Sequence, residues 1–465
     1  MRVIILGAGI IGVSTAWHLL ERGHEVTVVD RQPAAALETS FANAAQISVS
    51  YGEPWAHKDA PLKILRCMFQ QCGFRHDAPL LLRLQLDPHQ WRWCLKFLAQ
   101  CNAAAFERNV QQLVALGAYS HGALKEVASG IEFSHLARGI AHYYTDQKSL
   151  DTAASAASLM RTYGVQRQIV SREELLRIEP AFKSFAHRIV GGSYTASDES
   201  GDAHLFTKAL ADRCALRGAE FLYGHDIQRL VQAGGTIESV AVHARGAWAG
   251  SQKLLHLKGD AVVVACGPYT APLLRTVGVN LPIYPSKGYS ATFKLLQPEL
   301  APLVSLIDDE VMCSMSRLGS SDDGASDEWD ETGGKGYLRV AGATELGGYD
   351  LSLDTALARA RCQLLVDRVE EVLPGVCDTR SEADGGQPRF WAGLRPATPT
   401  SLPFIGKTPV NKLWVSAGHG ALGWTHGAGS GKALAELISG EQPKTGFQFY
   451  GMAPPTSSPP SLVPT

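Results

Sequence analysis

The chain opens on a strand–turn–helix pattern that leaves few folds open to it. An apolar run from Arg2 to Leu6 predicts a buried strand, and Gly7-Ala8-Gly9-Ile10-Ile11-Gly12 follows it directly. A helix is predicted from Ile10 to Arg22, and a second strand from Glu25 to Val29, which ends at Asp30. This order is the start of a βαβ unit, and it predicts a Rossmann-like α/β fold.

The glycine turn also predicts a dinucleotide site. Gly7 permits the tight turn, Gly9 lets a pyrophosphate approach the backbone, and Gly12 lets helix and strand pack closely. Asp30 follows at the end of the second strand, where its carboxylate can accept hydrogen bonds from a ribose. The pattern by itself leaves FAD and NAD open. The residues predicted to contact the dinucleotide here are Gly7, Gly9, Ile10, Ile11, Gly12, Asp30 and Arg31.

The segment from Glu38 to Ser48 favours FAD. It is dense in small, hydroxyl and amide residues, which can bond a pyrophosphate and line a flat ring with little bulk. An ordinary polar loop is the alternative interpretation. The candidate contacts are Thr39, Ser40, Asn43, Ala45, Gln46 and Ile47, together with Ala265 and Gly267 after a buried strand from Asp260 to Ala265.

A second glycine-rich segment stands near the C-terminus, after a buried strand predicted from Trp414 to Ala417. We expect Gly429 and Gly431 to open a helix that runs to Ile438. A helix N-terminus aimed at a flavin would stabilise the negative charge that reduction places on the ring. His419 is either an electrostatic partner of that ring or a residue that shapes the loop. The predicted contacts are His419, Gly420, Leu422, Gly423, Trp424 and Thr425.

Arg395 stands in Gly393-Leu394-Arg395-Pro396, which we interpret as a turn. A guanidinium binds a carboxylate bidentately and orients it. A lone arginine is usually a surface residue, but its place ahead of the second glycine-rich segment favours a substrate ligand.

Composition excludes several other classes of protein. The 43 Lys and Arg against 45 Asp and Glu give a net charge of −2, so no basic excess points to nucleic acid. The nine cysteines are scattered without a CxxC, which disfavours a disulfide framework or a zinc site and favours a reducing compartment. No stretch reaches the roughly 18 apolar residues of a membrane span.

Three other segments are informative. Helices are predicted over 80–99, 103–127 and 356–372. In the first, residues 91–97 mix aromatics and cations, which is typical of an interfacial helix, although a helix face packed in the core is the simpler interpretation. The acidic segment 319–335 predicts a long hairpin loop, either a solvated surface loop or a lid, and the Pro-rich residues 451–465 predict a disordered tail.

These motifs resemble the FAD-dependent D-amino acid oxidase superfamily, and most closely its bacterial D-amino acid dehydrogenases of small-subunit type. The resemblance extends to about residue 445. Beyond the motifs above, it rests on Tyr51-x-x-Pro54-Trp55, on residues 198–202 and 205–207, and on Tyr284-Pro285-x-Lys287-Gly288-Tyr289-Ser290. The length of the acidic loop departs from the family pattern at a place that bears on substrate access.

The resemblance implies a non-covalently bound FAD and oxidative deamination of a D-amino acid to a 2-oxo acid and ammonia. A quinone would take the electrons, which favours a cytoplasmic protein attached peripherally to the inner membrane. Arg395 would hold the substrate carboxylate, Tyr289, Tyr284 and Tyr51 would wall the pocket, and Lys287 would reach the flavin edge through water. Residues 198–202 are expected to form a turn and a helix cap.

The resemblance also implies two interleaved domains. The FAD-binding domain would comprise residues 1–80, 198–278 and 392–450, and a mixed-sheet α+β substrate domain residues 81–197 and 279–391. Two other functions remain open. One is a glycine, sarcosine or hydroxyproline oxidase of the same superfamily, and the other is a non-catalytic flavin-binding partner subunit.

Overall fold

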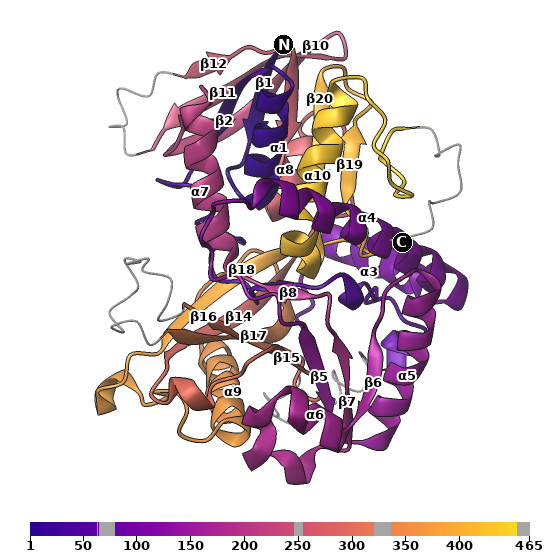
Figure 1. The fold of residues 1–465 in the computed structure, drawn as a ribbon. Coiled ribbons are helices and arrows are strands. Elements are labelled where there is room, and N and C mark those ends of the chain that lie inside the picture. Colours follow the sequence, from indigo (N-terminus) through magenta and orange to yellow (C-terminus); the bar gives the residue numbers. More distant parts are fainter. Residues whose placement is uncertain (63, 65–79, 246–253, 320–335, 453–465) are drawn as a thin grey trace.

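In a computed structural model, residues 1–62, 64, 80–245, 254–319 and 336–452 are described (Figure 1). A six-stranded sheet contains the predicted βαβ start. Its strand order is β19-β20-β13-β1-β2-β9, and all neighbours are parallel except β19 and β20. The strands are β1 (Arg2–Leu6), β2 (Glu25–Val29), β9 (Glu220–Leu222), β13 (Ala261–Val264), β19 (Phe404–Lys407) and β20 (Leu413–Ala417). This topology confirms the Rossmann-like fold.

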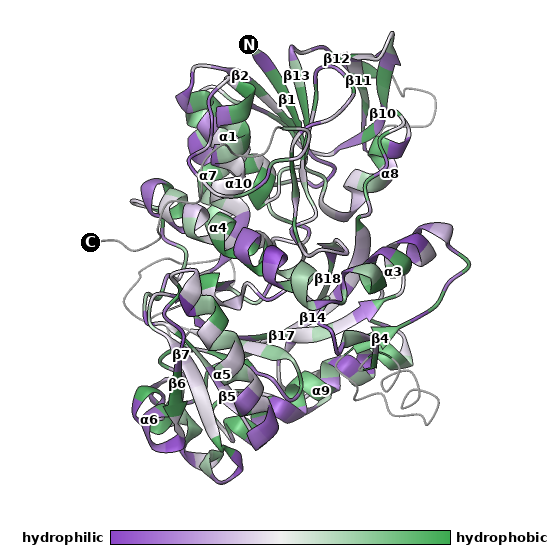
Figure 2. Ribbon diagram, turned by 90° about the vertical axis from the view of Figure 1, so that its right-hand side faces the viewer, coloured by the Kyte–Doolittle hydropathy of each residue, from purple (hydrophilic) through white to green (hydrophobic). Residues whose placement is uncertain are grey.

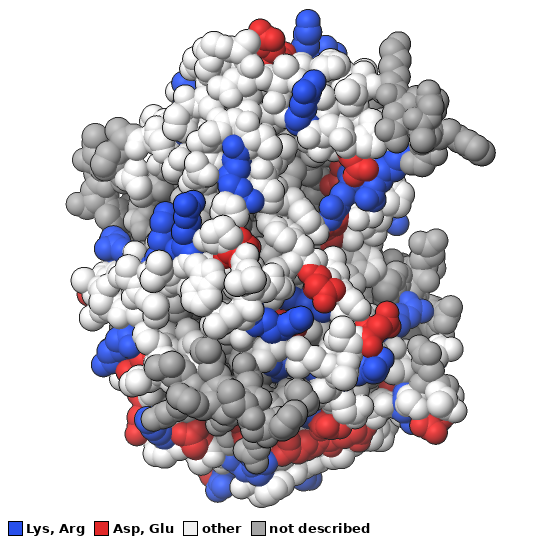
Figure 3. All heavy atoms as spheres, turned by 180° about the vertical axis from the view of Figure 1, so that it is seen from behind, with Lys and Arg blue, Asp and Glu red and all other residues white. Residues whose placement is uncertain are grey.

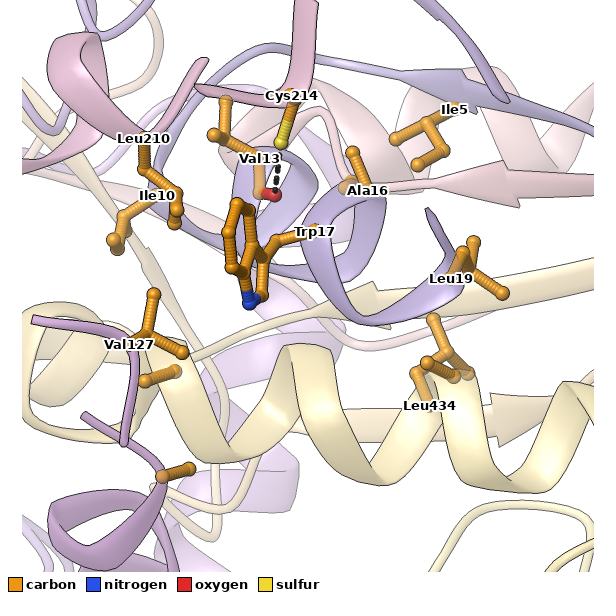
Figure 4. Close-up of a cluster of buried hydrophobic side chains, with 14 of the residues drawn as sticks. Ile5, Ile10, Val13, Ala16, Trp17, Leu19, Val127, Leu210, Cys214 and Leu434 are labelled. Atoms are coloured by element: carbon orange, nitrogen blue, oxygen red, sulfur yellow. Dashed lines mark hydrogen bonds between the residues drawn. The ribbon is translucent and has the colours of Figure 1, made fainter. Parts of the chain in front are cut away.

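Helices cover one face of this sheet and a smaller sheet covers the other. The helical layer consists of α1 (Ile10–Glu21), α7 (Ala203–Leu216), α10 (Gly423–Ile438) and, across α10, α4 (Ala103–Val127). Figure 4 shows Leu19 of α1 beside Leu434 of α10 in the shared core. The opposite face packs against α8 (Thr270–Arg275) and the antiparallel strands β10 (His225–Ala233), β11 (Thr236–Ala244) and β12 (Leu255–Leu257).

The start of α10 differs from the prediction. The helix begins at Gly423, so Gly429 and Gly431 lie inside it and do not open it. They are packing residues: a Cβ on Gly429 would lie 2.5 Å from Ser120 Cα of α4, and one on Gly431 would lie 2.5 Å from the Ser14 carbonyl carbon of α1. The two glycines that we expected to open the helix therefore let three helix backbones approach one another.

The second large sheet is mixed, with the order β18-β14-β17-β16-β15-β5-β7-β6, and β4 pairs with β17. Helix α9 (Ala356–Val372) packs against one face of it. Its strands are β4 (Leu80–Leu82), β5 (Ile140–Tyr144), β6 (Gln168–Ser171), β7 (Gly191–Thr195), β14 (Tyr284–Lys294), β15 (Ser305–Asp308), β16 (Cys313–Leu318), β17 (Tyr337–Leu346) and β18 (Arg389–Ala397). The remaining described helices and strands include α3 (Pro88–Gln100), α5 (Gln147–Thr162), α6 (Arg172–Ile178), β3 (Gln46–Ile47) and β8 (Glu199–Ser200).

Two predicted helices agree with the structure and one does not. The helices over 103–127 and 356–372 are confirmed, whereas residues 80–99 divide into β4 and α3. The reason is that β4 pairs with β17, a partner more than 250 residues away along the chain. Residues 320–335 of the acidic loop and 453–465 of the tail lie outside the described residues. The two domain boundaries stay a prediction.

On the face drawn in Figure 3, positive and negative side chains are interspersed and much of the surface is uncharged. In the part of the chain that the structure describes, we find no helix with the length and apolar character needed to cross a membrane.

Candidate active site

A cavity of about 580 Å³ is lined by residues from both large sheets. It brings together most of the residues predicted from the sequence. Those lining it are Gly7, Gly9, Ile10, Ile11, Asp30, Arg31, Thr39, Ser40, Asn43, Ala45, Gln46, Tyr51, Ala265, Gly267, Tyr289, Arg395, His419, Gly420, Leu422, Gly423, Trp424 and Thr425. Gly12, Ile47, Tyr284 and Lys287 do not line it.

At one end of the cavity the glycine turn is held by backbone contacts. Gly7 has a φ of +109°, and a Cβ on it would lie 2.5 Å from the Ala265 oxygen. A Cβ on Gly12 would lie 1.9 Å from the Gly7 oxygen, so Gly12 supports the turn without lining the cavity. Asp30 accepts from the Ala8 N–H at 2.7 Å, and burial raises the pKa of its carboxyl.

Neither of the two helices that begin at the cavity is capped by the side chain of its own N-cap residue. Neither Gly9, the N-cap of α1, nor Leu422, the N-cap of α10, provides a capping side chain. Uncapped N–H groups and the helix dipole make such ends favourable sites for negative charge. Since a pyrophosphate and a reduced flavin ring are both negatively charged, the residues present fit FAD. Residues at the α1 end would hold the pyrophosphate and those at the α10 end the flavin.

The segment predicted to favour FAD forms the wall between these ends. The Ser40 hydroxyl accepts from the Ile10 N–H at 3.1 Å, and Thr39 donates to the Leu394 oxygen at 2.8 Å. The Asn43 side chain accepts from the Ala45 N–H at 2.9 Å. The amide of Gln46 donates to Ser305 at 2.8 Å. These bonds join the segment to α1 and to the second sheet.

Arg395 lies at the other end of the cavity, on strand β18 and not in the predicted turn. Its Nη1 donates to the Ala343 oxygen at 3.0 Å and to the Thr344 hydroxyl at 3.4 Å. Ala343 has a φ of +53° beside an irregularity in the pairing of β14 with β17. Such irregularities re-aim backbone groups next to active sites. Arg395 forms no ion pair with a carboxylate of the described residues, and burial lowers its pKa to about 10.

Gly288 makes room for this guanidinium. Gly288 lies on β14 opposite Gly393 of β18, and a Cβ on it would lie 2.4 Å from Arg395 Cζ. Gly288→Ala should therefore shift the guanidinium and lower kcat/KM about a hundredfold, since an error of about 1 Å in position can slow a reaction by that factor. Steady-state kinetics would measure it. FAD content should match the wild type, and an unchanged kcat/KM would contradict this role.

The predicted tyrosines are not equivalent. Tyr51 lies in a 3₁₀ turn (Val49–Tyr51) and lines the cavity. Tyr289 contributes to the lining, but its hydroxyl donates to Glu345 at 2.7 Å within the core that packs against α9. Tyr284 is buried in another cluster, with Trp93 and Phe97 of α3.

Lys287 faces away from Arg395. Residues opposite each other on an antiparallel pair share a face, and Arg395 is opposite Ser286. Lys287 therefore points to the other face, where its ammonium donates to the Ser352 oxygen at 2.6 Å. The structure does not bring Lys287 or Tyr284 into the cavity.

His419 is buried beside α10, and its Nε2 lies 2.9 Å from the Ser430 hydroxyl. Burial lowers its pKa to about 3, and His426 adds to this effect, so the imidazole is neutral. A neutral imidazole held by Ser430 supports the interpretation that His419 shapes the loop. Asp202 is the N-cap of α7 and accepts from the His204 N–H at 2.8 Å, which confirms the predicted helix cap.

The sequence analysis did not find several lining residues. They include Asp226 and Gln228 of β10, Tyr269 near α8, Met312 and Ser314 near β16, and Thr344 of β17. These residues carry no local motif. The folding of distant segments brings most of them to the cavity, so no local signal could have placed them. Tyr269 is the exception, because it lies in the same 3₁₀ turn as the predicted contact Gly267.

Comparison with known proteins is consistent with this geometry. The sequence profile of the family described as "FAD dependent oxidoreductase" matches residues 2–437, and the chain belongs to that family. It is 45% identical over 452 residues to the D-amino acid dehydrogenase of Dechloromonas aromatica (strain RCB), covering 97% of this chain and 99% of that protein.

Solved structures with the same fold are more distant. The L-proline dehydrogenase from P. horikoshii has a TM-score of 0.67 at 17% identity, covering 95% of this chain and 94% of that one. The glycine oxidase from Geobacillus kaustophilus has a TM-score of 0.67 at 19% identity, covering 95% and 96%. These identities support the fold alone.

Proposed function

We propose that this protein is a FAD-dependent dehydrogenase that oxidises D-amino acids to 2-oxo acids and ammonia. The observation that carries the proposal is Arg395. Its guanidinium has no carboxylate partner among the described residues. It lies at one end of the cavity, and the glycine turn that we assign to the dinucleotide lies at the opposite end. An α-carboxylate of the substrate would supply the missing anion. The 45% identity to a D-amino acid dehydrogenase supports the handedness.

The protein's part in the reaction is mainly positional. Arg395 would hold the substrate carboxylate, with Tyr51 as a second polar group in the same cavity. The substrate amine must be neutral before the Cα–H bond can break. FAD, when bound, supplies the acceptor for the hydride. The uncapped start of α10 would stabilise negative charge near its N–H groups.

Anaerobic titration of the purified holoenzyme tests this function. D-amino acids should bleach the visible flavin band, and L-amino acids should not. Bleaching only by glycine, sarcosine or proline derivatives, with peroxide formed in air, would assign the protein to the alternative oxidases. A flavin that no amino acid reduces would contradict an enzymatic function and support a binding subunit.

We also propose that a membrane quinone accepts the electrons and that α3 contacts the membrane surface. Trp93 and Phe97 of α3 pack in the core, but Trp91 and Leu95 on the same helix are 46% and 67% exposed. Leu98 of the same helix is also exposed, and so are its cations Arg92 and Lys96. Two further exposed leucines, Leu84 and Leu86, precede the helix. In Figure 2, α3 lies at the edge of the molecule above β4. Apolar side chains next to cations are typical of interfacial helices.

Leu95→Glu should weaken binding to anionic phospholipid vesicles about tenfold, because it removes apolar contact and adds like charge. Cosedimentation would measure the binding. Flavin reduction by a D-amino acid should stay unchanged, and so should vesicle binding in the control Leu216→Glu, at an exposed leucine on α7. Equal sedimentation of all three proteins would contradict a role for α3.

A further inference from the structure

A polar cluster adjoins the Arg395 end of the cavity, and substrate binding gives a role to only one of its members, Tyr51. It extends from Tyr51, which lines the cavity, into the second sheet and the segments beside it. We define the polar cluster as Tyr51, Glu53, His142, Tyr144, Arg167 and Asp309.

His142 is the unusual member of the polar cluster. It lies on β5 and is 2% exposed, yet neither ring nitrogen has a hydrogen-bond partner among the described residues. Its ring centroid is 5.8 Å from that of Tyr51 and 6.5 Å from that of Tyr144. A buried polar group without a partner usually marks an ordered water. Both nitrogens of His142 are therefore available to bind water.

Hydrogen bonds continue the polar cluster beyond Tyr144. Arg167 is buried and donates to the Tyr144 hydroxyl at 2.9 Å and to Glu53 at 2.6 Å. The Tyr144 hydroxyl in turn lies near enough to the carboxylate of Asp309 to stabilise its ionised form, and Asp309 is an exposed residue. A series of polar groups thus extends from the cavity to solvent.

The proposed reaction needs such a path. An amino acid binds with an ammonium group, which must lose one proton before hydride can leave Cα. The acidic side chains that line the main cavity are Asp30, Glu38 and Asp226, at the glycine-turn end, away from Arg395. No carboxylate among the described lining residues lies beside Arg395, so a proton released there has to travel.

We propose that the polar cluster is a water-assisted path by which the substrate's ammonium proton leaves the cavity, with His142 as its relay and Asp309 as its last acceptor. This inference rests on the proposed function. One N–H bond of the ammonium breaks, and its electron pair stays on nitrogen. Tyr51 takes the proton and passes its own toward His142, which gains a proton on one nitrogen and loses one from the other. The proton ends on the Asp309 carboxylate, then in solvent.

Charges around the relay support this direction of transfer. Burial, and then the positive charge of Arg167, hold the pKa of His142 well below its usual value, so the ring passes a proton on without keeping it. Burial raises the pKa of Asp309 to about 6. Arg167 and Tyr144 lower this pKa, whereas the negative charges of Glu53 and Asp308 raise it. Asp309 can accept a proton only when ionised, so the rate should rise as pH increases through about 6.

The test is the rate of anaerobic flavin reduction in the holoenzyme, from pH 5 to pH 9, with the D-amino acid that reduces the wild type. His142→Phe should lower this rate about a hundredfold, the lower bound for loss of a proton-transfer group. Added imidazole should restore part of the rate in His142→Ala, which leaves space for the ring that phenylalanine would fill. Asp309→Asn should remove the inflection near pH 6.

Controls separate the relay from folding and from the proposed function. Tyr194→Phe alters the neighbouring strand β7, where its hydroxyl donates to the Arg138 oxygen at 2.8 Å, and should leave the pH profile unchanged. If His142→Phe does not bind FAD, His142→Gln keeps a polar group and should lose the same rate. Wild-type pH profiles in the His142 and Asp309 variants, without imidazole rescue, would overturn the relay. A wild type that no D-amino acid reduces would overturn the proposed function as well.

Discussion

Replacing Arg395 with alanine is expected to lower kcat/KM for the D-amino acid about a thousandfold while FAD remains bound. The guanidinium is the only cation among the described residues that we place at the substrate carboxylate, and truncating one partner of a buried charge pair costs about 4 kcal/mol. That free energy corresponds to about a thousandfold. The cofactor should stay because the glycine turn and Asp30 lie at the other end of the cavity. Steady-state kinetics and the visible spectrum measure the two effects.

Two further variants sharpen this experiment. Arg395→Lys keeps the charge but loses the bidentate geometry, so its kcat/KM should fall between those of the wild type and the alanine variant. Arg229→Ala removes an exposed arginine of β10 and should leave kcat/KM unchanged. Retained affinity for D-amino acids in Arg395→Ala would exclude the clamp and leave the carboxylate without an assigned ligand.

The parts of the site that could be predicted from the sequence are those that local structure encodes. Gly7, Gly12 and Asp30 belong to one βαβ unit, so their spacing alone places them at the dinucleotide end. Arg395 was predicted in the wrong element, a turn, but its residue type and its place before the glycine loop still indicated the cavity. The charge and hydrogen-bonding geometry of the arginine side chain therefore identified Arg395 as a site residue, although the predicted secondary structure around it was wrong.

Strand register explains the failures. Lys287 and Gly288 are neighbours in the sequence, but they face opposite sides of β14, and only the pairing with β18 shows which side meets Arg395. That pairing joins segments about 100 residues apart, so local periodicity cannot supply it. The sequence motif thus indicated Lys287 and Tyr284 as site residues. The residue that lies against the guanidinium is instead Gly288, between Lys287 and Tyr289.

The C-terminal glycines show the same difficulty for helices. Glycine is a poor helix former, so a run of glycines predicts a loop. In α10 these glycines are inside a helix because tertiary packing outweighs propensity: α1 and α4 approach so closely that a side chain would collide with their backbones. Close approach of α1 and α10 also fixes the two uncapped helix ends that face the cavity. Packing and cofactor binding therefore depend on the same contact.

Gly431→Ala is accordingly expected to destabilise the holoenzyme by about 3 kcal/mol, the upper range for overpacking a core. The added Cβ would lie 2.5 Å from the Ser14 carbonyl carbon and 2.6 Å from the Thr15 nitrogen, and a helix backbone cannot move aside as a flexible side chain can. Separation of α1 from α10 should also weaken FAD binding. The denaturation midpoint and the release of flavin on heating measure both effects.

Gly122→Ala provides the matched control. Gly122 lies in α4, is exposed, and has no atom within 4 Å of the position that a Cβ would take. Alanine there should stabilise the protein by up to about 1 kcal/mol, because it favours the helix without any clash. The two substitutions are chemically identical and both lie inside helices, so opposite shifts would isolate the effect of packing. If Gly431→Ala raised the midpoint as Gly122→Ala does, helix propensity would outweigh packing, and the close approach of α1 and α10 would not be needed to hold the cofactor.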